Sequence, residues 1–273
     1  MSAKTWFITG TSRGFGREWA LAALERGDRV VATARDASSL DTLVAIHGAA
    51  VLPVSLDVTD REAVFAAVAR GHQHFGRLDI VVNNAGYGQF GMIEELTEQE
   101  SREQIETNFF GALWVTQAAL PFLRAQGSGH VLQVSSIGGI CAFPGIGAYH
   151  ASKWALEGLS QSLAQEVAGF GIKVTLIEPG AYSTDWGGTS ARHATAIPAY
   201  DKVREQAANR PSRRGTAGDP VATRDAVLTL VDSDDPPLRA FFGEAPLSIA
   251  TADYESRLAT WNQWQPVSVE ASG

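Results

Sequence analysis

The stretch "TWFITGTSRGFG", residues 5–16, joins a short apolar run to three glycines, Gly10, Gly14 and Gly16. The apolar run is typical of a parallel strand that is buried on both faces. Glycines at these positions permit a tight turn, close approach of a pyrophosphate, and close packing of the next helix on the strand. The exposed N–H groups at the start of that helix favour an anion. A simple tight turn is the alternative, but the position between a strand and a helix favours an anion site.

Further apolar runs alternate with longer helical patterns along the chain. Strands are expected at residues 5–10, 29–34, 50–57, 79–86, 130–136 and 173–180, and helices at 16–26, 38–47, 60–75, 98–125 and 148–169. This order predicts an α/β fold, a doubly wound parallel sheet of the Rossmann type. Ligands of such sheets bind at the carboxyl ends of the strands.

The last third of the chain changes in character. Residues 185–220 are rich in Gly, Pro, Ser and Arg and are expected to form an inserted loop with one or two short helices, partly mobile. Residues 221–273 are expected to complete the same domain as helix, strand and helix, at 220–232, 238–243 and 247–264. The sequence therefore predicts a single domain over residues 1–273.

Composition excludes several classes of protein. The chain has 273 residues, of which 45% are hydrophobic, and a net charge of −8, which argues against a nucleic-acid partner. One cysteine, Cys141, allows neither an intrachain disulfide nor a cysteine-based zinc cluster, and no other metal site is expected. No apolar run reaches the roughly 18–20 residues that span a bilayer, and no signal peptide is visible. A cytoplasmic location with no membrane association is the resulting expectation.

The segment "YHASK", residues 149–153, places Tyr149 and Lys153 on one face of a predicted helix. A tyrosine has a pKa of about 10 in water, and a nearby cation typically lowers it by about 1–3 units. The pair can therefore make a proton donor out of a phenol. Tyr and Lys at this spacing also occur often on solvated helices, so the pair alone is weak evidence of function.

The glycine spacing, G-x3-G-x-G, resembles that of the short-chain dehydrogenase/reductase family. Other marks of the family follow in order over roughly residues 5–185: "LDV" at 56–58, "NNAG" at 83–86, "TNFFG" with Asn108, "SS" at 135–136, "YHASK", and "EPGAYST" at 178–184. The joint occurrence of these marks is far more specific than any one of them.

The resemblance implies roles for four residues. Tyr149 is expected to be the acid or base, and Lys153 to lower its pKa and to bind the nicotinamide ribose. Ser136 is expected to be the second donor to the substrate oxygen; Ser135 is the alternative, but the family spacing selects Ser136. Asn108 is expected to hold a water that connects Lys153 to solvent, although it could simply cap or bend its helix.

The choice of dinucleotide depends on the end of the second strand. Asp36 lies 20 residues after Gly16, where an acid would suit the ribose of NAD. By resemblance, however, the NAD-selecting acid belongs at Ala34, and Arg35 and Arg13 occupy positions that are basic in NADP-preferring relatives. Two guanidinium groups suit a 2′-phosphate, so NADP(H) is predicted. The alternative is that both arginines are surface residues and that Arg35 pairs with Asp36.

The residues expected to bind the cofactor are Gly10, Ser12, Arg13, Gly14, Phe15, Gly16, Arg35, Asp57, Val58, Asn84, Ala85, Gly86, Tyr149, Lys153, Pro179, Gly180, Tyr182 and Thr184. The candidate positions facing a substrate are mostly apolar, namely Gln89, Phe90, Ile137, Phe143, Tyr182 and Trp186. They favour an uncharged ketone, aldehyde or alcohol. A non-catalytic NADP(H)-binding redox sensor is the alternative function, although such relatives usually lose the tyrosine or the lysine. The resemblance also leaves a homodimer or a homotetramer open.

Overall fold

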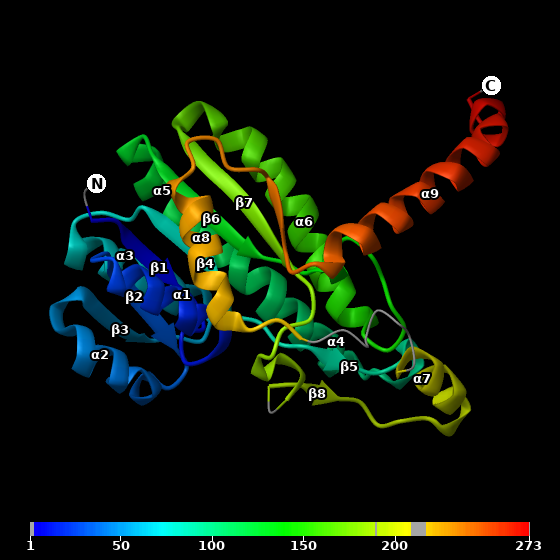
Figure 1. The fold of residues 1–273 in the computed structure, drawn as a ribbon, viewed down its shortest axis with the longest axis horizontal. Helices are drawn as coiled ribbons and strands as arrows, with labels where there is room; N and C mark the ends of the chain where they lie inside the picture. The colour runs from blue at the N-terminus through cyan, green and yellow to red at the C-terminus, as the bar shows by residue number, and fades with distance from the viewer. Residues whose placement is uncertain (1–2, 189, 209–216, 273) are drawn as a thin grey trace.

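The computed structural model describes residues 3–188, 190–208 and 217–272. Its main sheet has seven strands, all parallel, in the order β3-β2-β1-β4-β6-β7-β9 (Figure 1). The strands are β1 (Thr5–Ile8), β2 (Arg29–Ala34), β3 (Val51–Ser55), β4 (Ile80–Asn83), β6 (Gly129–Val134), β7 (Ile172–Pro179) and β9 (Arg239–Phe242). The predicted doubly wound, Rossmann-like fold is therefore confirmed.

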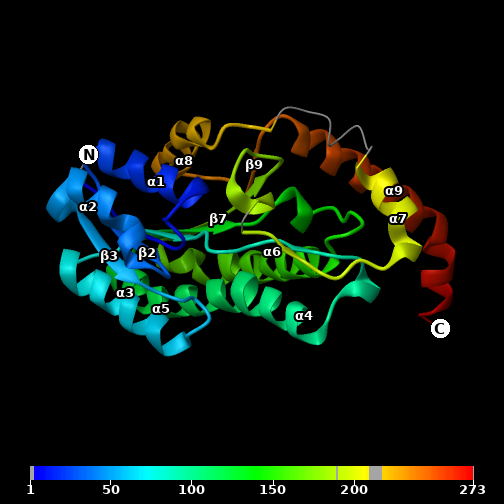
Figure 2. The same ribbon diagram turned by 90° about the horizontal axis from the view of Figure 1, so that it is seen from below.

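Helices cover both faces of this sheet. They are α1 (Gly14–Glu25), α2 (Asp41–His47), α3 (Arg61–Phe75), α4 (Glu98–Ile105), α5 (Gly111–Gln126), α6 (Gly147–Val167), α7 (Asp201–Ala208), α8 (Thr223–Asp232) and α9 (Ala245–Glu270). Figure 2 shows α1 and α8 on one face of the sheet, and α3, α5 and α6 on the other.

Strand β1 shows why the sheet is buried on both sides. Successive side chains of a strand point to opposite faces, so Trp6 and Ile8 join the core cluster under α1 and α8, whereas Phe7 joins the cluster under α3, α5 and α6. All three side chains are fully buried. The unbroken apolar run in the sequence thus supplies two cores at once.

The strands end earlier than the sequence predicts. β1 ends at Ile8 and β4 at Asn83, and the next residues leave the sheet. The Thr9 hydroxyl accepts hydrogen bonds from the backbone N–H groups of Asn84 and Ala85, both at 2.9 Å. These bonds hold the two strand ends together where the sheet opens.

The helix expected at residues 98–125 is interrupted. One wide turn of π-helix, Glu106–Phe110, separates α4 from α5. Insertions of this kind occur frequently at functional sites. The turn contains Asn108, so the alternative that this residue bends its helix agrees with the observed backbone.

Two features beyond the main sheet were not predicted. A small parallel sheet pairs β5 (Gln89–Phe90) with β8 (Arg192–His193). The last helix, α9, runs from 245 to 270, six residues beyond its predicted end. The predicted insertion at 185–220 contains β8 and α7, while its residues 189 and 209–216 lie outside the described residues. No helix in the described ranges is long and apolar enough to cross a membrane.

Candidate functional site

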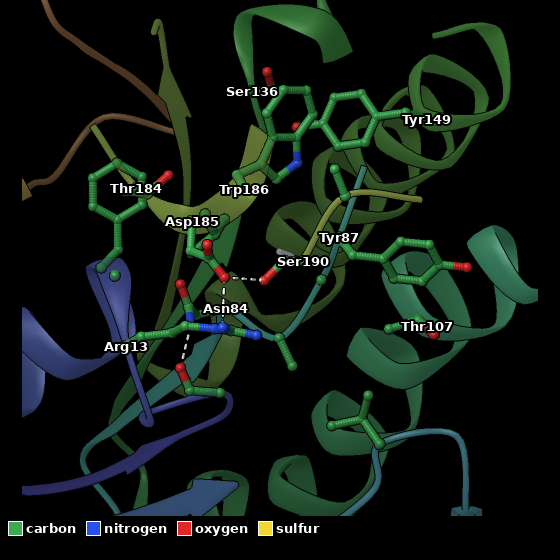
Figure 3. Close-up of a pocket in the computed structure, with 18 of the residues that line it drawn as sticks. Arg13, Asn84, Tyr87, Thr107, Ser136, Tyr149, Thr184, Asp185, Trp186 and Ser190 are labelled. Carbon is green, nitrogen blue, oxygen red and sulfur yellow. Dashed lines mark hydrogen bonds and ion pairs between the residues drawn. The ribbon is translucent and has the colours of Figure 1, made fainter. Parts of the chain in front are cut away.

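A cleft of about 880 Å³ opens at the carboxyl ends of the strands (Figure 3). The predicted site residues that line it are Gly10, Ser12, Arg13, Gly14, Phe15, Arg35, Asp57, Val58, Asn84, Ala85, Gly86, Ser136, Tyr149, Lys153, Pro179, Gly180, Tyr182 and Thr184. Of the predicted catalytic and cofactor-binding residues, Gly16 and Asn108 do not line it.

The glycine turn has the backbone that its sequence predicts. Gly10 and Gly14 have φ values of 70° and 58°, in the left-handed region that favours glycine. Gly16 is different, because a Cβ there would lie 2.4 Å from the Gly10 carbonyl oxygen and 2.5 Å from Nδ2 of Asn84. Gly16 lies in the first turn of α1 and faces the ends of β1 and β4, so it permits close packing of the helix and does not line the cleft.

The two predicted phosphate-binding arginines both reach the cleft, but in different surroundings. Arg13, within the glycine turn, forms an ion pair with Asp185, with Nη1 and Oδ2 2.5 Å apart (Figure 3). Arg35 is exposed at the end of β2. Asp36 does not line the cleft; its carboxylate accepts a hydrogen bond from the Ser38 N–H at 3.0 Å and begins the next turn. In the described ranges no ion pair joins Arg35 to Asp36.

Tyr149 and Lys153 lie side by side on α6, and both are buried. The Lys153 ammonium nitrogen is 5.7 Å from the centre of the Tyr149 ring and donates a hydrogen bond to the Val134 carbonyl at 2.7 Å. Burial lowers the pKa of Lys153 to about 8, while the negative charge of Glu157 opposes this shift.

Burial also raises the pKa of Tyr149 to about 12, against the opposite effect of a side-chain hydrogen bond with Ser136. For the chain by itself the net shift is therefore upward, opposite in direction to the lowering expected beside Lys153, because burial is the largest effect. The sequence shows the spacing of the pair, but it does not show that both side chains are removed from water.

Ser136 begins the loop that follows β6, and His150 holds this loop in place. The Ser136 hydroxyl oxygen accepts a hydrogen bond from the Gly138 N–H at 2.9 Å. The Gly138 carbonyl oxygen lies 2.7 Å from Nδ1 of His150. Nε2 of His150 accepts a hydrogen bond from the Phe143 N–H at 2.8 Å. Because Nε2 accepts this hydrogen bond, it carries no proton. Nδ1 therefore carries the proton and donates to the Gly138 carbonyl. The sequence indicated no role for His150. In the structure its two ring nitrogens bind Gly138 and Phe143 and so stabilise the loop that follows Ser136.

Asn108 lies behind the cleft wall at Gly86. Its Oδ1 accepts a hydrogen bond from the Tyr87 N–H at 3.1 Å, and its Nδ2 donates to the Tyr87 carbonyl at 3.0 Å and to the Ser152 hydroxyl at 3.1 Å. A Cβ at Gly86 would lie 3.0 Å from this Oδ1 and 3.8 Å from the Lys153 nitrogen. Asn108 thus joins the end of β4 to α6 directly beside the lysine.

Residues 182–188 and 190–193, which we name the strap, contribute side chains to one wall of the cleft. Trp186 packs edge-to-face on Tyr149, with ring centres 4.9 Å apart (Figure 3). Further along, Arg192 forms an ion pair with Glu103 and lies over the Tyr87 ring, 4.6 Å from its centre. The strap is therefore tied to three separated parts of the chain.

Several lining residues had no signal in the sequence. They are Tyr87, Glu103, Glu106, Thr107, Asp185, Ser190 and Arg192. Arg192 and Glu103 are 89 positions apart, so only the folded chain brings them together. The polar character of these residues corrects the expectation of a mostly apolar rim.

Only two of the six predicted substrate-facing residues, Tyr182 and Trp186, line this cleft. Of the other four, Gln89 is fully buried, its backbone N–H donating to Gln104. Phe90 packs on Trp186 from a second, smaller cavity. Ile137 and Phe143 pack in a cluster with Ala250 of α9, which agrees with the alternative that such side chains are ordinary core.

The chain matches known proteins along nearly its whole length. Residues 4–194 match the family model for short chain dehydrogenases. The "Oxidoreductase BOA17" of Botryotinia fuckeliana is 42% identical over 272 residues, 98% of this chain and 99% of that protein. A short-chain dehydrogenase structure from Streptomyces avermitilis has a TM-score of 0.91 and 41% identity, covering 99% of both chains.

A more distant solved structure is an alcohol dehydrogenase from Thermococcus sibiricus, complexed with 5-hydroxy-NADP. It has a TM-score of 0.75 and 29% identity, and the match covers 88% of this chain and 96% of that one. Similar folds are also solved with NADP in a Burkholderia cenocepacia protein and with NAD in a Burkholderia phymatum protein. The family model and the long, highly identical matches agree with the fold, and the chain belongs to the short-chain dehydrogenase/reductase family of oxidoreductases.

Proposed function

We propose that the protein is an NADP(H)-dependent oxidoreductase that interconverts a carbonyl and an alcohol on an uncharged, mainly apolar small molecule. The observation that carries this proposal is the meeting of Tyr149, Ser136 and Lys153 in the same cleft as the glycine turn. When bound there, the nicotinamide exchanges a hydride with the substrate carbon, and the chain supplies placement and the proton.

Tyr149 acts as the proton donor when a carbonyl is reduced. Its raised pKa keeps the phenol in the protonated form that a proton donor requires at neutral pH, and the neighbouring Lys153 cation favours release of that proton. Ser136 donates the second hydrogen bond to the substrate oxygen, where negative charge develops. Oxidation of an alcohol requires the phenolate instead, and the Lys153 cation is the neighbouring group that favours it.

Lys153 also holds the nicotinamide ribose in this proposal. An ammonium has three donors, and one is used on the Val134 carbonyl. The other two are available to the phenol and to a ribose hydroxyl. Asn108 Oδ1, on the same side of Gly86 as the lysine nitrogen, accepts one bond from Tyr87 and keeps a lone pair for a water that reprotonates Lys153.

The glycine turn and its neighbours fit a dinucleotide. A Cβ at Gly10 would lie 3.1 Å from the backbone of Ala85, so a side chain there would narrow the floor of the cleft. Two features favour a 2′-phosphate over a bare ribose: Arg35 lines the cleft at the end of β2, and the carboxylate of Asp36 is turned into the next backbone turn. Arg13 would exchange its Asp185 partner for the phosphate.

The substrate pocket combines an aromatic wall with balanced charges. Trp186 packs edge-to-face with Tyr149, and Arg192, which lines the cleft beyond it, has its charge paired with Glu103. An apolar carbonyl would lose little hydration there, whereas a carboxylate or phosphate would have to break this pair. Residues 185–220 form the substrate loop in this proposal, and residues 221–273 complete the same domain.

Assembly and location belong to the same proposal. We expect a homodimer or a homotetramer located in the cytoplasm, without nucleic acid as a partner. The net charge of −8 is consistent with the last point, because a phosphate backbone binds basic surfaces.

The test is a panel of apolar ketones and aldehydes incubated with the protein and NADPH, followed by the loss of nicotinamide absorbance. We expect turnover with at least one member, and a much lower rate with NADH at the same concentration. A protein that binds NADPH tightly and turns over nothing in either direction would instead be a redox sensor.

A further inference from the structure

Helix α9 leaves the body of the molecule and ends far from it (Figure 1). Its first half is anchored, because Ile249 and Ala250 pack against Ile140 and Cys141 of the loop after β6. Arg257 adds a hydrogen bond to the Ile140 carbonyl at 3.2 Å. Every residue from 258 to 270, which we name the arm, is exposed.

The arm and the helical turn before it carry large apolar side chains in water. Tyr254 is 48% exposed, Leu258 51%, Trp261 57% and Trp264 59%. Steps of four, three and three residues place these four side chains along one side of a helix. Within the arm the only charged residue is Glu270. A stripe of this kind is typical of an interface and costs free energy if it stays in water.

The arm is also a poor helix by itself. Isolated helices shorter than about 12–15 residues are marginal in water, and this one contains Pro266, which removes a backbone hydrogen bond. None of the described residues packs over it, since all of its side chains are exposed. The arm therefore needs a covering surface that the described residues do not supply in order to remain helical.

We propose that this surface is a second copy of the chain, and that two copies exchange their arms across a two-fold axis. The arm and the turn before it, residues 254–270, span about 26 Å in a helix about 10 Å wide, so one side presents roughly 400 Å². A single copy of this segment on a foreign surface would bury about 800 Å² in total, below the roughly 1,200 Å² at which stable interfaces begin. Reciprocal exchange doubles this to about 1,600 Å², within the standard range.

The surface beside the start of the arm, where Arg257 lies over Trp154, would form part of the site that the partner's arm contacts. Trp154 of α6 is 39% exposed there, and the Arg257 guanidinium lies 4.8 Å from the centre of its ring. If the two arms cross near residue 258, the apolar stripe of each arm can contact Trp154 of the partner subunit. A membrane is a poorer match, because helices that bind membrane surfaces are rich in Lys and Arg and residues 258–273 have neither.

The test is the mass of the full chain in solution, measured by light scattering during size exclusion at micromolar concentration. This inference deepens the self-association proposed above, and the mass needs no substrate, so it can fail while turnover is observed, or hold without it. We expect wild type to have the mass of two chains or an even multiple. Trp261→Glu/Trp264→Glu should at least halve that mass.

Ser256→Glu/Gln263→Glu is the matched control, because it adds the same two charges to α9 away from the stripe. It should keep the mass of wild type, and both variants should keep the far-ultraviolet circular dichroism of the body and bind NADPH equally. A wild type with the mass of one chain would overturn the proposal, whether or not it sediments with phosphatidylcholine vesicles. Equal masses for the two double variants would overturn it as well.

Discussion

On one side of the cleft, formed by the glycine turn and the ends of β1 and β4 and here named the glycine side, close contacts with the backbone leave no space for larger side chains. Gly16 lies against the Gly10 carbonyl, and Thr9 joins the two strand ends. On the opposite side, the strap (182–188 and 190–193) is held by side-chain pairs such as Arg13 with Asp185. In the proposed function, the first side binds the cofactor, which is the constant part of the ligand, and the second side adapts to the substrate.

Tyr149→Phe should have the largest effect, because it removes the proposed proton donor and leaves the glycine side intact. General acid catalysis contributes about 10²–10⁴-fold, so turnover should fall by at least about 100-fold. The affinity for NADPH, measured by fluorescence titration, should change less than about threefold. A large loss of NADPH affinity would show that the two sides are not separable in this way.

Arg35→Ala should act on the glycine side alone. A hydrogen bond to a charged group contributes about 1.5–3 kcal/mol, so the Kd for NADPH should rise about 10- to 100-fold. The Kd for NADH, which has no 2′-phosphate, should stay within about twofold. Asp36→Ala is the control and should leave the preference for NADPH unchanged. If Arg35→Ala weakened both cofactors equally, the NADP(H) assignment would fail.

Gly16→Ala tests how rigid the glycine side is. The new Cβ would meet the Gly10 carbonyl at 2.4 Å, and overpacking of this kind costs about 1–3 kcal/mol of unfolding free energy. Gly158→Ala on α6 is the matched control, because nothing lies within 4 Å of its new Cβ. It should stabilise the protein by about 0.5–1 kcal/mol. Urea unfolding of both variants measures the contrast; equal stabilities would contradict it.

The smallest effect concerns pH and the sheet that both sides share. Burial lowers the pKa of His130 in β6 to about 3, whereas the unfolded side chain titrates near 6.5. Between these values the unfolded state binds the extra proton, so the contribution of His130 to stability is present above about pH 6.5 and is lost as the pH falls.

The slope of this loss is at most about 1.4 kcal/mol per pH unit. His130→Gln keeps a donor for Thr175 and cannot titrate, so its unfolding free energy should fall less steeply between pH 6 and 4 than that of wild type. Comparing the two slopes cancels the contributions of the other titrating groups. Parallel slopes would mean that His130 is accessible to protons in the folded chain.

Much of the glycine side was predictable because its signals are local. The apolar run at 5–10, the glycines of the turn and the spacing from Tyr149 to Lys153 are each contained within a few consecutive residues, and each depends on local backbone geometry. The pKa of Tyr149 was not predictable in direction, because burial depends on residues that are distant in sequence. For the same reason the role of His150 was not predictable. Its ring binds Gly138 and Phe143, the two ends of a loop that precedes α6.

The sequence by itself determined the family, the parallel sheet and the set of polar groups at its edge, because periodicity, glycine positions and motif spacing are encoded locally. Only the tertiary structure decided which of these groups are buried away from water and which charges are paired across the cleft. It also decided that α9 leaves the body of the molecule with Trp261 and Trp264 exposed. Desolvation and ion pairing depend on distances between segments tens of residues apart, and these distances exist only after the chain has folded.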